Sequence, residues 1–221
     1  MPLPREAVRR PPDLSQITLA VIAGGKGERM GFPKSRLQFR EQPILAWLLR
    51  QMQWPGPTLL VTAANVAHPP AADLFDREAI DPVEGLGPLR GLLTALEESS
   101  TPIVALVTVD MPGVRASILA RLVMMLTAQP ETKGVMYRVA SEEGGRIEPF
   151  PSAFRREARE EISARLDAGK RSVQALAGLS GFLAQEAPIE CPANTWANLN
   201  TPEEFSAFEA LHRKFSSKER L

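Results

Sequence analysis

The sequence predicts an α/β fold in which a mostly parallel central sheet lies between two layers of helices, a three-layer α/β/α arrangement. Two observations predict it. Short runs of β-branched and aliphatic residues, typical of buried parallel strands, alternate with amphipathic segments along most of the 221 residues. A glycine-rich loop directly follows the first of these runs, at a place where parallel α/β sheets bind ligands.

The first part of the chain begins this alternation. Residues 17–23, ITLAVIA, predict a buried strand that ends in glycines. Residues 43–52, PILAWLLRQM, predict a helix, because apolar residues recur at helical spacing behind a proline that suits the first turn. Strands over 58–64 and 78–81 and a helix over 87–100 complete this part.

The second part continues the same pattern. Residues 102–110, PIVALVTVD, predict a buried strand, and a helix over 116–129 and a strand over 133–140 follow. Residues 152–169 carry charges at helical spacing and end in a glycine stop, so we expect a helix there. Residues 201–215 begin with Thr-Pro-Glu-Glu, a capping-box pattern that predicts the last helix.

No internal repeat or linker divides the chain, so we expect one domain over residues 17–215. Residues 1–16 contain prolines and arginines without an apolar core, which predicts a mobile tail and argues against a secretory signal. Residues 216–221 are expected to form a second tail.

Composition excludes several classes of function. Basic and acidic residues balance at 26 each, so no overall field attracts nucleic acid or an anionic membrane. A single cysteine, Cys191, excludes an internal disulfide framework and a multi-cysteine zinc site. No apolar run is long enough to cross a bilayer. We therefore expect a soluble, cytoplasmic protein.

The loop over residues 24–34 predicts a phosphate-binding site. Its glycines let backbone N–H groups point at phosphate oxygens, and Arg29 and Lys34 add cationic donors. Two familiar motifs do not match. Glutamate and proline occupy both glycine positions of the Walker loop, and Met30 takes the third glycine of the dinucleotide fingerprint. The alternative is a tight turn with a solvated basic face.

Asp110 is the candidate metal ligand. It ends an apolar strand, where a lone carboxylate is costly unless it is exposed or paired. Hard oxygen ligands suit Mg²⁺, which takes few protein carboxylates and keeps several waters. The alternative is that Asp110 only caps the turn at Met111 and Pro112.

Four segments, in the expected order, together resemble a known family: AGGKGERMGFPK (23–34), GPLRGLLTAL (87–96), VTVDMP (107–112) and NLNTPEEF (198–205). Over roughly residues 17–213 the chain is similar to the nucleotidyltransferase superfamily, and within it to the molybdenum cofactor guanylyltransferases. The resemblance implies a Rossmann-like nucleotidyltransferase fold. It also implies a nucleotide half over about 17–115 and an acceptor half over about 116–215.

By this resemblance the protein transfers GMP from Mg-GTP to the terminal phosphate of molybdopterin and releases pyrophosphate. The implied catalytic residues are Arg29, Lys34 and Asp110, with Mg²⁺ on Asp110. The implied nucleotide-binding residues are Ala23, Gly24, Gly25, Gly27, Lys34, Asp81, Gly87, Pro88 and Asp110. The implied acceptor contacts are Arg146, Asn198 and Asn200.

Plainer interpretations stand beside some of these roles. Asp81 also fits an ordinary Asp-Pro turn, and Asn198 and Asn200 fit turn chemistry before the capped helix. An attacking phosphate monoester is already an anion and needs no strong protein base. Accordingly His68 and His212 fall in no motif, and we expect both at the surface.

Base and acceptor choice have alternatives as well. The chain has Gly24-Gly25 after the strand, the form of the guanylyl enzymes, whereas cytidylyl relatives carry Ala-Gly. Thr62 or Ala64 stands where many relatives have an asparagine that meets the nucleotide. The alternatives are cytidylyl or other nucleotidyl transfer to molybdopterin or another small phosphate, or a non-catalytic nucleotide-binding accessory protein of cofactor hand-over.

The resemblance also implies the partners. They are GTP and molybdopterin, together with molybdenum cofactor insertion or delivery proteins and apo-molybdoenzymes. Neither nucleic acid nor a membrane is among them.

Overall fold

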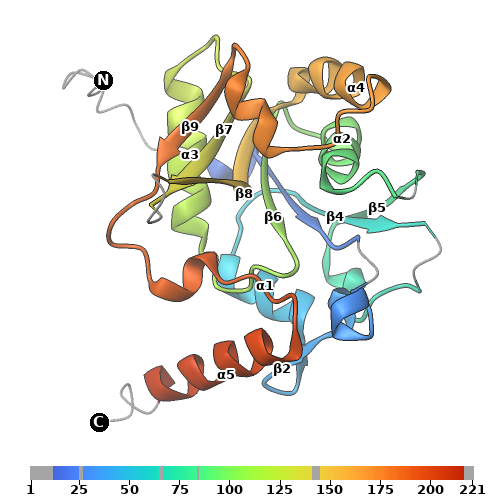
Figure 1. Ribbon diagram of the computed structural model, residues 1–221, viewed down its shortest axis with the longest axis vertical. Coiled ribbons are helices and arrows are strands. Elements are labelled where there is room, and N and C mark those ends of the chain that lie inside the picture. Colours follow the sequence, from blue (N-terminus) through green and yellow to red (C-terminus); the bar gives the residue numbers. More distant parts are fainter. Residues whose placement is uncertain (1–11, 25–26, 65–66, 84, 141–144, 217–221) are drawn as a thin grey trace.

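The computed structural model describes residues 12–24, 27–64, 67–83, 85–140 and 145–216. A seven-stranded sheet in the order β5-β4-β1-β6-β8-β7-β9 forms its centre (Figure 1). The strands are β1 (Thr18–Ile22), β4 (Thr58–Ala63), β5 (Arg77–Asp81), β6 (Ile103–Thr108), β7 (Gly134–Val139), β8 (Arg146–Arg155) and β9 (Phe182–Glu186), and β2 (Gln38–Phe39) and β3 (Gln42–Pro43) form a separate hairpin. Every neighbouring pair in the large sheet is parallel except the two that β8 makes. The expected mostly parallel α/β fold is confirmed.

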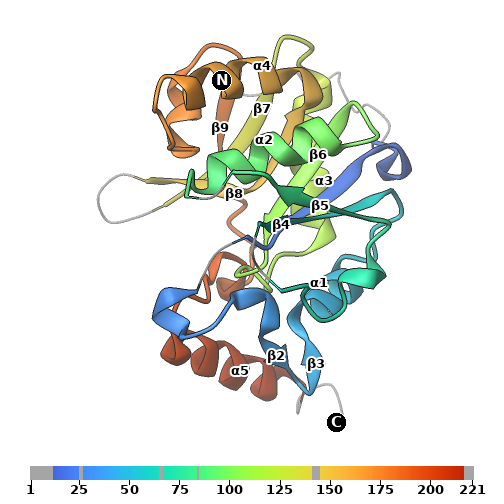
Figure 2. The ribbon, with the colours of Figure 1, turned by 90° about the vertical axis from the view of Figure 1, so that its right-hand side faces the viewer.

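Helices cover both faces of this sheet. The α-helices are α1 (Ile44–Met52), α2 (Pro88–Glu98), α3 (Ala116–Ala128), α4 (Arg159–Asp167) and α5 (Pro202–Ser216). The 3₁₀ helices are η1 (Leu14–Gln16), η2 (Glu28–Met30), η3 (Lys34–Arg36), η4 (Ala72–Leu74), η5 (Arg156–Ala158), η6 (Gln174–Gly178) and η7 (Ala193–Trp196). Helices α2 and α4 pack together in front of the sheet in Figure 2, and α3 lies behind it. These are the expected three layers.

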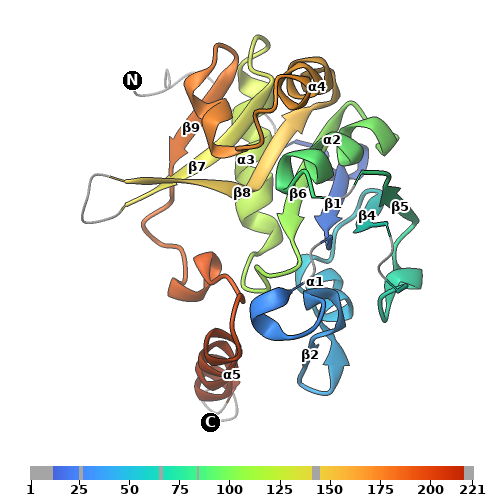
Figure 3. The same cartoon turned by 45° about the vertical axis from the view of Figure 1, so that its right-hand side comes forward.

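Strand β1 lies at the centre of the parallel part. It is flanked by β4 and β6, and all five of its residues are buried. The register sets Ile22 opposite Val61 of β4 and Thr108 of β6. Because these strands run in the same direction, their carboxyl ends meet at one edge of the sheet, and the loops that follow them gather there (Figure 3).

The helix expected over residues 152–169 is wrong in its first part. Residues 152–155 belong to β8, which pairs antiparallel with both β6 and β7, and α4 begins only at Arg159. Ser152, Ala153 and Phe154 have no exposed surface (0%). Strand pairing and burial therefore outweigh the local helical charge pattern at these residues. Strands β8 and β9 had not been expected from the sequence.

Helix α5 docks on the β2–β3 hairpin, below the sheet in Figure 1. The ring of Phe39 lies 5.2 Å from the ring of Phe208 and 5.4 Å from that of His212, between centroids. The expectation of a surface histidine at 212 is wrong, because only 8% of the residue is exposed. Burial lowers the pKa of His212, and the nearby guanidinium groups of Arg40 and Arg115 lower it further.

Most of the two expected tails, residues 1–11 and 217–221, lies outside the described residues. Where the description begins, the Asp13 carboxylate caps η1 by accepting the Ser15 N–H at 3.1 Å. In the described part of the chain, no helix is both long and apolar enough to cross a membrane.

Candidate active site

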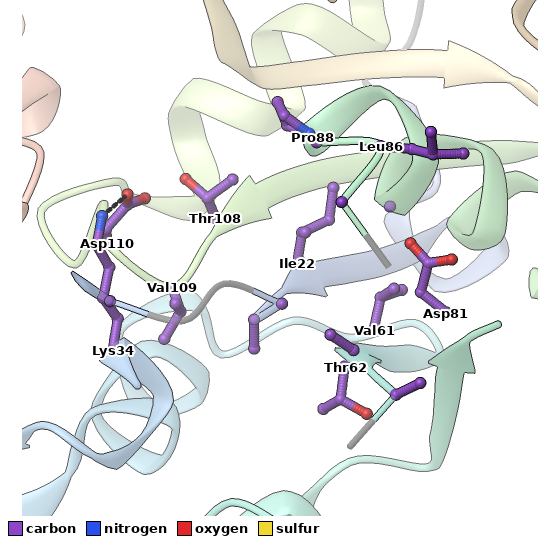
Figure 4. A pocket seen from close by; sticks show the side chains of 18 of the residues that line it. Ile22, Lys34, Val61, Thr62, Asp81, Leu86, Pro88, Thr108, Val109 and Asp110 are labelled. Atoms are coloured by element: carbon purple, nitrogen blue, oxygen red, sulfur yellow. Dashed lines mark hydrogen bonds and ion pairs between the residues drawn. The ribbon is translucent and has the colours of Figure 1, made fainter. Parts of the chain in front are cut away.

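A cavity of about 620 Å³ opens at the carboxyl ends of β1, β4 and β6 (Figure 4). This volume lies within the range of small-molecule and cofactor sites. Its wall combines the glycine loop after β1, the ends of β4 and β6, the loop between β5 and α2, and Asn200 just before α5. The parallel strand ends thus create the cavity, as the sequence predicted for this fold.

Two glycines of the loop have different structural roles. Gly27 has a φ of +60°, and a Cβ there would collide with the carbonyl oxygen of Phe32. Only glycine fits that turn. At Gly24 a Cβ would meet nothing closer than Ala63 at 3.5 Å, an ordinary contact. The backbone therefore accepts a side chain at Gly24, although the added methyl group would occupy space at the cavity wall.

At one end of the cavity, a lysine joins two oxygen-bearing side chains. The Lys34 ammonium donates to Asp110 Oδ2 at 2.6 Å and to Asn200 Oδ1 at 2.6 Å. The side chains of Lys34 and Asp110 are 19% and 20% exposed, so the pair is accessible but partly withdrawn from solvent. Figure 4 shows Lys34 and Asp110 pointing toward each other.

Backbone hydrogen bonds hold this cluster in place. The Leu199 N–H donates to the Asp110 carbonyl oxygen at 2.8 Å, which fixes the segment before α5 against the turn after β6. The Glu204 carboxylate accepts from the Asn200 and Thr201 N–H groups, and the Thr201 hydroxyl accepts from the Glu204 N–H at 3.3 Å. The predicted capping box is therefore present, and it also anchors Asn200.

Asp81 lies toward the other end of the cavity (Figure 4). Its Oδ1 accepts from the Val83 N–H at 3.1 Å and from Arg90 Nε at 3.1 Å. The carboxylate thus makes the turn contact that the plainer interpretation expected, and it also faces the cavity. Helix α2 starts at Pro88 behind Gly87, so its N-terminus, with a partial positive charge, borders the same space.

A residue from the second half of the chain stabilises the loop between β5 and α2 by a hydrogen bond. Arg171, which follows α4, donates from Nη1 to the carbonyl oxygen of Gly85 at 3.1 Å. Gly85 and Gly87 both have positive φ angles, +76° and +75°, so the loop depends on glycine conformations. Arg171 therefore supports the backbone of the cavity wall.

Most of the residues predicted from the sequence come together here. The predicted residues that line the cavity are Ala23, Gly24, Gly27, Arg29, Lys34, Asp81, Gly87, Pro88, Asp110 and Asn200. Gly25 lies outside the described residues. Asn198 does not line the cavity, although it directly precedes Leu199. Arg146 also lies away from the cavity, on β8, where it forms an ion pair with Glu148. Burial raises the pKa of Glu148, although the charge of Arg146 acts in the opposite direction.

Sequence reasoning missed part of the wall. Thr108 and Gly91 line the cavity, and both lie inside the segments quoted for the resemblance, but we had assigned neither of them a role. The spacing of four between Gly87 and Gly91 was a usable signal, because it puts two small residues on one side of a helix start. A Cβ at Gly91 would lie 3.0 Å from Ile22, so α2 packs closely on β1 there.

Thr62 also lines the cavity, and its hydroxyl has a partner. It donates to Glu78 Oε1 at 2.9 Å, while Glu78 Oε2 lies 2.9 Å from His68 Nδ1. The Thr62 hydroxyl, which stands near the position of the asparagine in many relatives, is thus hydrogen-bonded to Glu78 on the neighbouring strand β5.

The donor set near Asp110 suits a hard cation with few protein ligands. Among the described residues, no group of three or more His, Cys, Asp or Glu side chains is placed to hold a metal ion. The Asp110 carboxylate and the Asn200 amide oxygen nevertheless converge on one point, since both lie 2.6 Å from Lys34 Nζ. Such oxygens, completed by water, are the ligands that Mg²⁺ accepts.

Known proteins resemble the chain in sequence and in fold. Residues 19–185 match the family described as the MobA-like NTP transferase domain. A probable molybdenum cofactor guanylyltransferase of Halalkalibacterium halodurans is 28% identical over 194 residues, which cover 84% of this chain and 94% of that protein. A molybdenum cofactor guanylyltransferase of Cereibacter sphaeroides is 29% identical over 199 residues, covering 88% and 96%.

Among solved structures, molybdopterin-guanine dinucleotide biosynthesis protein A of Archaeoglobus fulgidus superposes with a TM-score of 0.72. The match covers 89% of this chain and 99% of the other at 19% identity. At that identity the likeness shows a common fold.

Proposed function

Because the chain belongs to the MobA-like NTP transferase domain family, we propose that it transfers GMP from Mg-GTP to the terminal phosphate of molybdopterin and releases pyrophosphate. The family makes it a nucleotidyltransferase. The names of its relatives, molybdenum cofactor guanylyltransferases that it matches over most of their length, support the choice of GTP and molybdopterin.

The observation that carries the proposal is the charge arrangement in the cavity. The glycine loop, Arg29 and Lys34 supply donors for an anion, and Asp110 supplies a carboxylate beside them. A purely basic loop would bind phosphate without needing that carboxylate. The combination suits a nucleoside triphosphate that arrives with a cation.

The proposed chemistry makes electrostatic demands on these residues. An anionic phosphate monoester attacks an anionic α-phosphate, so the enzyme must stabilise negative charge as it develops. Arg29 offers a forked donor and Lys34 a mobile ammonium for the phosphate oxygens. Asp81 and the N-terminus of α2 would hold the nucleoside at the other end of the cavity. Asp110 and Asn200 would hold Mg²⁺, which supplies Lewis-acid neutralisation of phosphate charge when bound.

The acceptor contacts proposed from the sequence lie on the C-terminal side of the molecule. Asn200 belongs to the cavity, whereas Asn198 and Arg146 lie outside its wall. Any contact of Asn198 or Arg146 with molybdopterin would therefore be made beyond the nucleotide cavity.

Base preference follows from the backbone at Gly24. A missing Cβ there leaves room at the cavity wall beside Ala63, and a purine needs more room than a pyrimidine. We therefore assign GTP rather than CTP as the preferred substrate.

The test is a transfer assay with purified protein, GTP labelled at the α-phosphate, Mg²⁺ and molybdopterin. We expect labelled dinucleotide and pyrophosphate, both dependent on molybdopterin and on the metal. A clear preference for CTP would establish cytidylyl transfer instead. Nucleotide binding without pyrophosphate release, with molybdopterin present, would favour a non-catalytic accessory protein.

A further inference from the structure

Lys34 makes contacts that phosphate binding alone does not require. Its ammonium lies 2.6 Å from Asp110 Oδ2 and 2.6 Å from Asn200 Oδ1, so two of its three donors are used inside the cluster. Both bonds are short and one is to a carboxylate, the stronger kind of hydrogen bond. In this cluster the Lys34 ammonium bonds both acceptors, Asp110 and Asn200, at the same time.

The two acceptors are also the oxygens best suited to a divalent cation. A carboxylate and an amide carbonyl are hard donors of the kind that Mg²⁺ and Mn²⁺ use. A metal bound to both would compete with the ammonium for the space between the two oxygens, and the two positive charges would repel each other at this short range. A divalent cation is therefore opposed at the cluster as long as Lys34 occupies it.

We propose that Lys34 is a tethered cation that keeps the Asp110–Asn200 pair closed to divalent metal until the nucleotide's phosphates draw its ammonium away. This inference rests on the proposed metal-dependent function. Lys34 can make the exchange because its flexible stem starts on η3, and it lines the same cavity as Gly24 and Gly27.

The consequence is a coupling between metal and nucleotide. Without nucleotide, a metal ion must displace the Lys34 ammonium from Asp110 and Asn200. With nucleotide bound, the ammonium contacts the phosphates instead, and the two oxygens are open to the metal. Thermodynamic linkage makes the coupling reciprocal, so metal also favours nucleotide binding. The protein thereby limits how much metal it holds when no nucleotide is present.

The experiment measures Mn²⁺ alone, without nucleotide, against the full chain. Free Mn²⁺ is followed by its electron paramagnetic resonance signal for wild type and for Lys34→Met, which keeps a similar length without charge. We expect Lys34→Met to bind Mn²⁺ at least tenfold more tightly. The double variant Lys34→Met with Asp110→Asn should lose that gain.

Arg29→Met is the matched control. It removes one positive charge from the same cavity, and the structure shows no contact between Arg29 and Asp110. A general change of electrostatic field would raise Mn²⁺ affinity in both single variants alike, whereas the proposal expects less than threefold for Arg29→Met. Thermal melts establish that each variant is folded, and Lys34→Gln serves in the same comparison if Lys34→Met is not.

Equal Mn²⁺ affinities in wild type and Lys34→Met would overturn the proposal. So would equal gains in the two single variants, or a gain that survives the loss of the Asp110 carboxylate. The outcome is separate from the proposed function, because the metal titration contains neither GTP nor molybdopterin. If the wild-type protein transfers GMP with metal but the Lys34→Met variant gains no affinity for Mn²⁺, the proposed function stands and the proposed role of Lys34 is wrong.

Discussion

The two halves of the molecule contribute very differently to the cavity. In the first half, residues 17–115, the strands that belong to the large sheet are all parallel to one another. Every described lining residue except Asn200 comes from this half, between Ile22 and Asp110. In the second half, residues 116–215, the antiparallel β8 interrupts the pattern, and only Asn200 reaches the wall. The carboxyl ends of parallel strands place functional groups at one edge of the sheet. The antiparallel β8 ends at the opposite edge, since its last residue, Arg155, pairs with Ile103 at the start of β6.

The largest expected effect tests whether the first half alone carries the chemistry. Asp110→Asn should lower metal-dependent turnover on the order of 10³-fold, because charge stabilisation by a metal is worth several kcal/mol. The variant is nearly isosteric, so its thermal melt should stay close to that of wild type. Turnover is measured across a Mg²⁺ titration, and a wild-type profile would remove Asp110 from the site.

Arg29→Ala should have the next largest effect. It removes a cationic donor that lines the cavity, and we expect turnover to fall by ~10²-fold, as for a lost oxyanion donor. Arg36→Ala is the control, since Arg36 is exposed on η3 and does not line the cavity. Similar small losses in both variants would mean that the basic loop is only solvated.

Gly24→Ala tests whether base choice also belongs to the first half. The added methyl group would meet Ala63 at 3.5 Å, so the fold should tolerate it. We expect the ratio of kcat/KM for GTP to that for CTP to fall about tenfold, the usual effect of one added carbon in a packed pocket. An unchanged ratio would contradict the role of Gly24 and leave the enzyme class intact.

The smallest effect tests the support that the second half gives to the first. Arg171→Met removes the bond to the Gly85 carbonyl, and we expect KM for GTP to rise about three- to tenfold with kcat nearly unchanged. Lys170→Met is the neighbouring control, for which no change is expected. If KM for the acceptor rises instead, Arg171 serves molybdopterin and not the loop.

The difference between the parallel first half and the second half, with its antiparallel β8, also explains which elements the sequence could predict. Strands β1, β4 and β6 were predictable because they are nearly continuous buried runs, and Lys34, Asp81 and Asp110 could be placed because parallel strands end at one edge. Strand β8 was not predictable, because two prolines and three charged residues interrupt its apolar pattern and only its partners β6 and β7 make it a strand.

Contacts between distant segments were the other failure. Lys34 and Asn200 are separated by 166 positions, and Arg171 and Gly85 by 86, so nothing local in the sequence indicates that they meet. The burial of His212 has the same cause, since its neighbours Phe39 and Trp47 come from the start of the chain. Local pattern identifies elements and strand ends, whereas these pairings depend on the assembled fold.

The bond between the Leu199 N–H and the Asp110 carbonyl, with Asn200 beside it, has a consequence for synthesis on the ribosome. All other described parts of the cavity wall are translated by residue 110, yet the cluster is closed by a segment made roughly 5 to 20 s later, at typical elongation rates. The cluster can therefore be completed only after Leu199 and Asn200 have been made and have left the ribosome.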